Sequence, residues 1–179
     1  HFNTVLYNGQ ETPLPVSGVG FTPDLVWIKN RTVAYSNVLY DSVRGTGNTK
    51  AIHSDLTIAE GATPQYQNLS SFDLDGFTLS DSTSTNTLVI ISSGGVPNPC
   101  DIVSINGTSY ADEAAAGLTA GTIAVSGLSA NTDLGFSVVK VVDHTNTKTI
   151  SHGLGTPPEL IITKVLDSSS FNWYVYHKD

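Results

Sequence analysis

One phrase occurs almost twice in this chain, and that repeat limits the folds it can adopt. Residues 16–29 read VSGVGFTPDLVWIK, and residues 150–164 read ISHGLGTPPELIITK. The second phrase follows the first at a constant offset, from Gly18 to Gly153 (153 − 18 = 135). Each copy combines a glycine turn, a proline at the entry to a strand and a buried strand. The repeat therefore predicts that one strand–turn–strand unit occurs twice in the fold.

The repeat also predicts a complete module followed by a partial one. Residues 1–95 are expected to form the first β-module, residues 96–131 a connector, and residues 132–179 a partial second module. A partial module leaves open sheet edges, which expose unpaired backbone groups. We therefore expect the missing half to follow in the parent chain or to come from another subunit. The alternative is a single sandwich in which the two copies are the facing halves.

Short β-branched or alternating runs dominate the chain, and turn formers such as Asp75-Gly76 separate them. Many short strands with regular turn signals predict an all-β fold, an antiparallel β-sandwich of jelly-roll or lectin-like type. One short helix is predicted over residues 109–117. Ser109 is the expected N-terminal cap, and Gly117 is expected to end the helix.

Charge and composition argue against several classes of partner. The chain has only 8 Lys plus Arg against 16 Asp plus Glu, and the basic residues are not clustered. Surfaces that bind nucleic acid or anionic membranes need clustered cations. The longest aliphatic run, residues 88–91, is far too short to span a bilayer. We expect no nucleic-acid partner, no membrane insertion and no cofactor. The single cysteine allows neither an internal disulfide nor a cysteine metal cluster.

Two carboxylates form the candidate metal site. Asp73 and Asp75 lie two residues apart in FDLDGF, a spacing at which oxygen ligands can face one calcium ion. The favoured interpretation is a tight Asp-Gly turn between two strands. The same pair could serve a glycosidase, although neighbouring loop positions rarely give the separation across a sugar that such enzymes need.

Aromatic residues form the candidate ligand site. Trp173, Tyr174 and Tyr176 lie in a strand-like segment where side chains alternate between two faces. An exposed indole or phenol ring could stack on a sugar. For Trp173, and for Trp27 in the first copy, a position in the core is the favoured interpretation.

Catalytic motifs are weak or missing in the sequence. Neither a Gly-x-Ser-x-Gly elbow nor a phosphate-binding loop of the usual spacing occurs, and the histidines are scattered. In DSVRG, Asp41 precedes Arg44 by three residues, which predicts an ion pair that pins the loop. We expect this pair to be exposed and to contribute roughly 0–1 kcal/mol.

The chain resembles a known family over almost its whole length. The segments that carry the resemblance are GVGFTPDLVWIKNR, LYDSVRG, FDLDGFTL, INGTSYADEAAAGLTAGT, SANTDLGFSVVKV and HGLGTPPELIITK. They are similar to β-rich modules of large structural and tail-fibre-like proteins of marine phages, including cyanophages. The resemblance implies a lectin-like sandwich of the concanavalin-A type and gives no catalytic residue to carry over. Family members usually have a Trp-rich closing strand where residues 86–95 here read NTLVIISSGG.

These observations predict a non-enzymatic structural protein of a virion, the extracellular phage particle. The chain would be a module of a tail fibre, spike or capsid fibre, with other virion subunits and host-surface carbohydrate as partners, and would form a homo-oligomer. The alternative is a capsid decoration, cement or surface-fibril subunit that assembles by strand completion. A carbohydrate-active enzyme is the third hypothesis.

Overall fold

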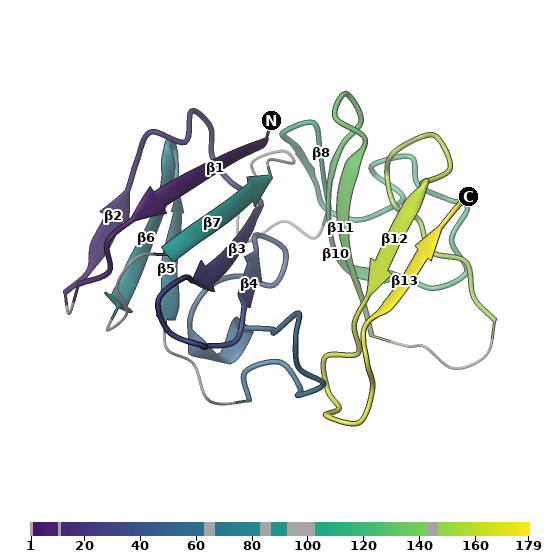
Figure 1. The fold of residues 1–179 in the computed structure, drawn as a ribbon. Coiled ribbons are helices and arrows are strands. Elements are labelled where there is room, and N and C mark those ends of the chain that lie inside the picture. Colours follow the sequence, from purple (N-terminus) through teal and green to yellow (C-terminus); the bar gives the residue numbers. More distant parts are fainter. Residues whose placement is uncertain (1, 11, 63–66, 83–86, 93–102, 143–146) are drawn as a thin grey trace.

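The computed structural model describes residues 2–10, 12–62, 67–82, 87–92, 103–142 and 147–179. Over these residues the chain is all-β, which confirms the predicted fold class. Strands β1 to β7 build one half of the molecule and strands β8 to β13 build the other, and the halves lie side by side (Figure 1). In the described ranges, no helix is long and apolar enough to cross a membrane.

The first half is an antiparallel β-sandwich. Its larger sheet has the order β1-β7-β3-β4 and its smaller sheet the order β2-β6-β5. The larger sheet contains β1 (Phe2–Tyr7), β7 (Thr87–Ser92), β3 (Leu25–Asn30) and β4 (Val38–Asp41). The smaller sheet contains β2 (Leu14–Val16), β6 (Gly76–Ser82) and β5 (Gln67–Asp73). A short 3-10 helix, η1 (Asn48–Lys50), lies between β4 and β5.

The core of the first half lies between these two sheets. Alternation along β3 buries Val26 and Ile28, because every second side chain of a strand points to the same face. They share one hydrophobic cluster with Phe77 and Leu79 of the facing sheet. Burying an apolar side chain of this size contributes about 1.5–3 kcal/mol. The predicted β-sandwich is thus confirmed.

The second half contains a four-stranded sheet of order β11-β10-β8-β9 and a separate two-stranded sheet, β12-β13. The four-stranded sheet contains β8 (Val103–Ile105), β9 (Thr108–Tyr110), β10 (Val125–Asn131) and β11 (Phe136–Val141). The two-stranded sheet contains β12 (Leu160–Thr163) and β13 (Tyr174–His177). A second buried cluster is built on Val103, Val125, Leu128 and Ala130, which come from β8 and β10.

One strand pair departs from the antiparallel prediction. β8 and β10 run parallel, with Val103 opposite Leu128. Parallel neighbours need a long connection that returns the chain to the same end of the sheet, and residues 106–124 supply it. Strands β8 to β10 all fall in the predicted connector, residues 96–131. The predicted boundary near residue 95 lies outside the described residues and stays a prediction.

The predicted short helix is wrong. Ser109, the expected cap, lies in β9, so only the segment from Asp112 to Gly117 remains, and it forms turns. The carboxylate of Asp112 accepts a hydrogen bond from the amide of Ala115 at 2.7 Å. Gly117 has φ +73° and donates to the carbonyl of Ala114 at 3.0 Å. The segment therefore has the cap and the glycine stop of a helix, but too few residues between them to propagate one.

Candidate functional site

The two-stranded sheet β12–β13 is unusual among the described strands, because every residue in both of its strands is exposed. The exposed fraction of its large apolar and aromatic side chains ranges from 41% to 65%. These side chains are Leu160, Ile161, Ile162, Tyr174, Val175 and Tyr176. A two-stranded sheet without a packed face is only marginally stable in water. The exposed sheet therefore lacks the packing that normally stabilises such a hairpin, and it is the candidate functional site.

The two faces of the exposed sheet differ in chemistry. Directly opposed residues in an antiparallel pair share a face. Ile161 lies opposite Tyr176, and Thr163 lies opposite Tyr174, which makes one face aromatic. Ile162 lies opposite Val175, which makes the other face aliphatic. The aromatic face thus brings together two of the three aromatic residues in the predicted ligand site.

Trp173, the third aromatic residue of that site, has a different environment. It precedes β13 and is half-buried, and its indole Nε1–H donates to the carbonyl of His53 at 2.7 Å. The structure thus places this ring against the first half of the molecule, apart from the phenols of Tyr174 and Tyr176. Sequence alternation alone could not identify this contact, because His53 is 120 residues away.

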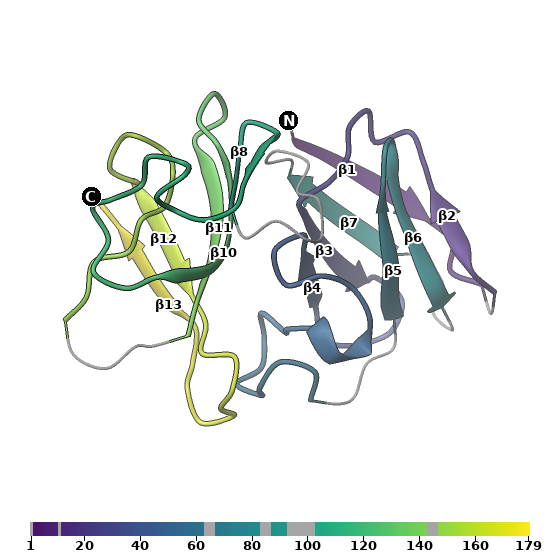
Figure 2. The same cartoon turned by 180° about the vertical axis from the view of Figure 1, so that it is seen from behind.

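The loop between β12 and β13 is bound to the first half of the molecule. Lys164 donates from Nζ to the carbonyls of Thr57 and Phe171, both at 2.9 Å. The amide of Glu60 donates to the carbonyl of Leu166 at 2.7 Å. Partial burial lowers the pKa of Lys164. The loop between β12 and β13 and the loop after η1 that carries Thr57 and Glu60 meet at the bottom of Figures 1 and 2, so the exposed sheet is held at its loop end.

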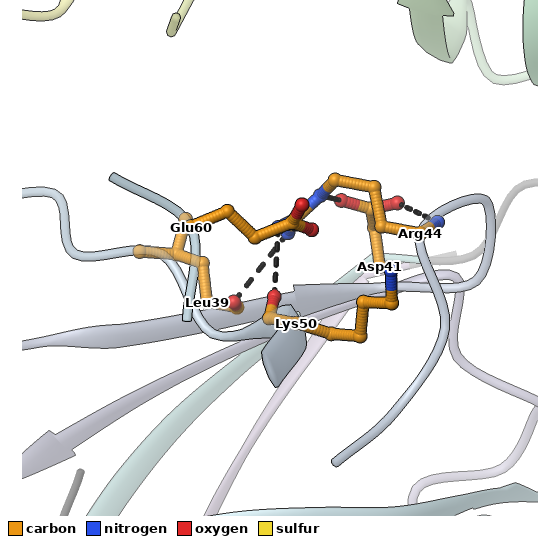
Figure 3. A network of polar contacts seen from close by, with 5 residues as sticks. All are labelled: Leu39, Asp41, Arg44, Lys50 and Glu60. Atoms are coloured by element: carbon orange, nitrogen blue, oxygen red, sulfur yellow. Dashed lines mark hydrogen bonds and ion pairs between the residues drawn. The ribbon is translucent and has the colours of Figure 1, made fainter. Parts of the chain in front are cut away.

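The buried guanidinium of Arg44 supports the loop that carries Thr57 and Glu60 (Figure 3). The guanidinium of Arg44 donates to the carboxylate of Asp41 at 2.5 Å, to the carbonyl of Lys50 at 2.8 Å and to Glu60 at 3.2 Å. The carbonyl of Leu39 lies 3.5 Å from its Nη2. The predicted Asp41–Arg44 pair is therefore confirmed, but it is buried rather than exposed. Breaking a buried ion pair typically costs about 3–5 kcal/mol, more than we expected for this pair.

A second junction joins the halves through a buried carboxylate. Asp24 is buried, and its Oδ1 accepts hydrogen bonds from Ser42 Oγ at 2.6 Å and from Ser129 Oγ at 3.4 Å. Nearby, a Cβ atom added to Gly127 would lie 2.4 Å from Cγ1 of Val43. This glycine lets β10 approach the loop after β4 more closely than a side chain would allow.

Asp73 and Asp75, the predicted metal ligands, contact different partners. The carboxylate of Asp75 accepts hydrogen bonds from the amides of Gly18 at 3.0 Å and Gly20 at 2.6 Å. Asp73 accepts from Thr78 Oγ1 at 2.7 Å. The amides of Gly20 and Gly18 lower the pKa of Asp75 by stabilising the charged form. Among the described residues, no three His, Cys, Asp or Glu side chains gather as a metal site, so the calcium role stays a prediction.

His53 is a buried titratable residue, and its backbone carbonyl is the one that accepts the hydrogen bond from Trp173. Its Nδ1 lies 2.9 Å from the carbonyl of Asn37, and since a carbonyl can only accept, Nδ1 carries the proton. Its Nε2 is buried and has no hydrogen-bond partner in the described part of the chain. Burial lowers the pKa of His53, and it outweighs the opposing effects of the Asn37 carbonyl and of Asp55. The ring therefore stays neutral at neutral pH.

A family model with the description "Domain of unknown function (DUF7483)" matches residues 1–179, the whole of this chain. No curated protein and no solved structure matches it.

Asp75→Asn tests whether this carboxylate holds the glycine loop. The variant should unfold at a lower urea concentration, because an amide offers one acceptor oxygen and no charge to the two glycine amides. Since folding lowers the pKa of Asp75, its contribution is present above pH 3.8 and is lost as pH falls through the lower folded value. Urea unfolding across this range should show a shallower acid dependence for the variant, with the exposed Asp133→Asn as control. A rise in Tm on adding calcium chloride to the native chain would instead support the cation site.

His53→Gln tests the buried imidazole. Because the folded pKa lies below 6.5, the unfolded chain takes up a proton first, so the stability of the native protein should fall as pH drops below 6.5. The variant should lose this slope in Tm measured between about pH 7.5 and 5.0. His177→Gln, in the exposed strand β13, should keep it. An unchanged slope in His53→Gln would contradict the assignment.

Proposed function

We propose a structural role for this chain, which belongs to the family described as a domain of unknown function, DUF7483. In this role the chain assembles with neighbouring subunits through the exposed sheet β12–β13. The observation that carries the proposal is that both faces of this sheet are exposed and rich in apolar side chains. Contiguous apolar patches on a protein surface commonly mark sites of interaction.

The first half of the molecule supplies the comparison that supports this role. There, the hairpin β3–β4 packs its apolar face into the core, with Val26 and Tyr40 fully buried. Burial raises the pKa of Tyr40 to about 12. A similar hairpin that remains exposed in the second half has apolar surface available for a partner. Charged residues, which commonly protect open strands, are absent from β12 itself.

The sequence resemblance suggests where such an assembly would operate. The similar modules belong to structural and tail-fibre-like proteins of marine phages, so we propose a fibre, spike or decoration protein of a virion as the setting. Its partners would be copies of itself and other virion subunits. This role needs no catalytic residue and no cofactor.

A charge placed on the aliphatic face tests the role. Ile162→Lys should prevent association, because burying an unpaired ammonium in an apolar interface is strongly unfavourable. Light scattering over a range of concentrations should show assembly of the native chain and a single 18.9 kDa species for the variant. The matched control is Leu74→Lys, since Leu74 is 90% exposed in the turn between β5 and β6. A native chain that stays monomeric throughout would contradict self-assembly.

Carbohydrate contact through the aromatic face is the second candidate function. Tyr174 and Tyr176 alternate on the strand, so their rings lie on one exposed face, where sugar rings could stack on them. Titration with host-surface oligosaccharides, followed by intrinsic fluorescence, should show an affinity about tenfold lower for Tyr176→Ala, the loss expected for one aromatic contact. Val175→Ala, on the opposite face, is the control. Equal affinities for all three proteins would contradict this function.

A further inference from the structure

The hairpins β3–β4 and β12–β13 pair in the same register, which makes their strands comparable residue by residue. In the first, Leu25 lies opposite Asp41, and in the second, Leu160 lies opposite His177. The offsets are 160 − 25 = 135 for the first strand and 177 − 41 = 136 for the second. The single extra residue lies in the connecting loop. Pairing thus extends the sequence repeat from the glycine phrase to the whole hairpin.

The two hairpins differ at one edge. β3 is paired on both sides, by β4 and by β7, and β7 runs antiparallel to it from Leu25↔Ser92 to Asn30↔Thr87. Among the described strands, β12 is paired only with β13. The backbone edge of β12 that corresponds to the β7 side of β3 therefore has none of the described strands paired with it. Figure 1 shows β3 between β7 and β4, whereas β12 has β13 on one side and faces toward β10 and β11 on the other.

The faces of the two hairpins also differ, because side chains that are buried in the first hairpin are exposed in the second. Val26 and Tyr40 are opposed on the core face of the first hairpin, and both are 0% exposed. At the same offsets the second hairpin has Ile161 opposite Tyr176, and Tyr176 is 57% exposed. The residue types are conserved between the copies, while their burial is not. The second hairpin thus has side chains typical of a buried sheet face, but they are exposed.

We infer that the free edge of β12 binds an aliphatic β-strand of a neighbouring subunit, which takes the place beside β12 that β7 takes beside β3. This inference rests on the proposed function and deepens it, because it names the edge, the occupant and the direction. The strand runs antiparallel to β12, as β7 runs antiparallel to β3. Its chemistry is that of β7, whose sequence is Thr-Leu-Val-Ile-Ile-Ser. Backbone hydrogen bonds supply the pairing, and uncharged side chains fit the uncharged strand.

Strand length favours a β7-like strand over β12 of a second copy. A β12 strand from a second copy is only four residues long and is already paired with its own β13. β7, by contrast, has six residues and pairs with β3 along its whole length, from Leu25↔Ser92 to Asn30↔Thr87.

The test uses the ¹⁵N-labelled chain and a synthetic peptide with residues 87–92 of this sequence between lysine pairs that keep it soluble. We expect saturable amide shift changes centred on β12, with one peptide bound per chain, and slower amide exchange along β12. A peptide with Val89→Pro should not bind, because proline removes a ladder donor. In the protein, Ile161→Lys should weaken binding at least about tenfold, since charge protects an edge. Leu74→Lys, in the exposed turn between β5 and β6, should leave binding within about twofold.

The remaining outcomes separate this inference from the proposed function. If the peptide causes no amide shift changes, the strand-binding inference is overturned. If Ile161→Lys then abolishes self-association, β12 of a second copy is the occupant and the structural role stands. Peptide binding by a chain that stays monomeric at all concentrations supports the edge site and contradicts self-assembly. Shifts spread over the first half, away from β12, overturn the assigned edge.

Discussion

The buried guanidinium of Arg44 is the interaction on which the junction between the two halves depends. It holds β4, the end of η1 and Glu60 together, and the backbone of Glu60 in turn receives the loop between β12 and β13. A guanidinium suits this position, because its planar donors can reach a carboxylate and several carbonyls in different directions at once. Since a desolvated cation without these partners is very unfavourable, the loop has little freedom to take another path.

Two copies of one sequence pattern occupy different environments in this molecule. The first copy is packed inside a sandwich, where the facing sheet covers it and β7 pairs with the edge of β3. The second copy keeps its pairing register and its apolar residues but lies exposed on both faces. Register is therefore a local property, set by backbone pairing within the hairpin, whereas burial depends on which other strands are present.

The sequence was sufficient for features whose cause lies in neighbouring residues. Strand alternation, the Asp75-Gly76 turn and the pairing of Asp41 with Arg44 three residues later all follow from local chemistry. At Gly76, however, local chemistry explains only part of the residue choice. A Cβ atom there would lie 1.9 Å from the carbonyl oxygen of Val16, a contact that only the fold reveals. The indole contact of Trp173 and the burial of Arg44 depend on segments far along the chain. Ser109 was misassigned because strand pairing with β8 competes with capping, and propensity alone does not decide between them.

The anchored loop has a kinetic consequence for any strand that reaches β12. Lys164 and Trp173 fix the loop to the first half. The hairpin is therefore already ordered before its partner strand arrives. The entropy of arranging that template has been lost during folding, so most of the remaining cost falls on the incoming segment. A preorganised receptor of this kind should gain affinity through long residence times, and each contact made in an assembly would then tend to persist.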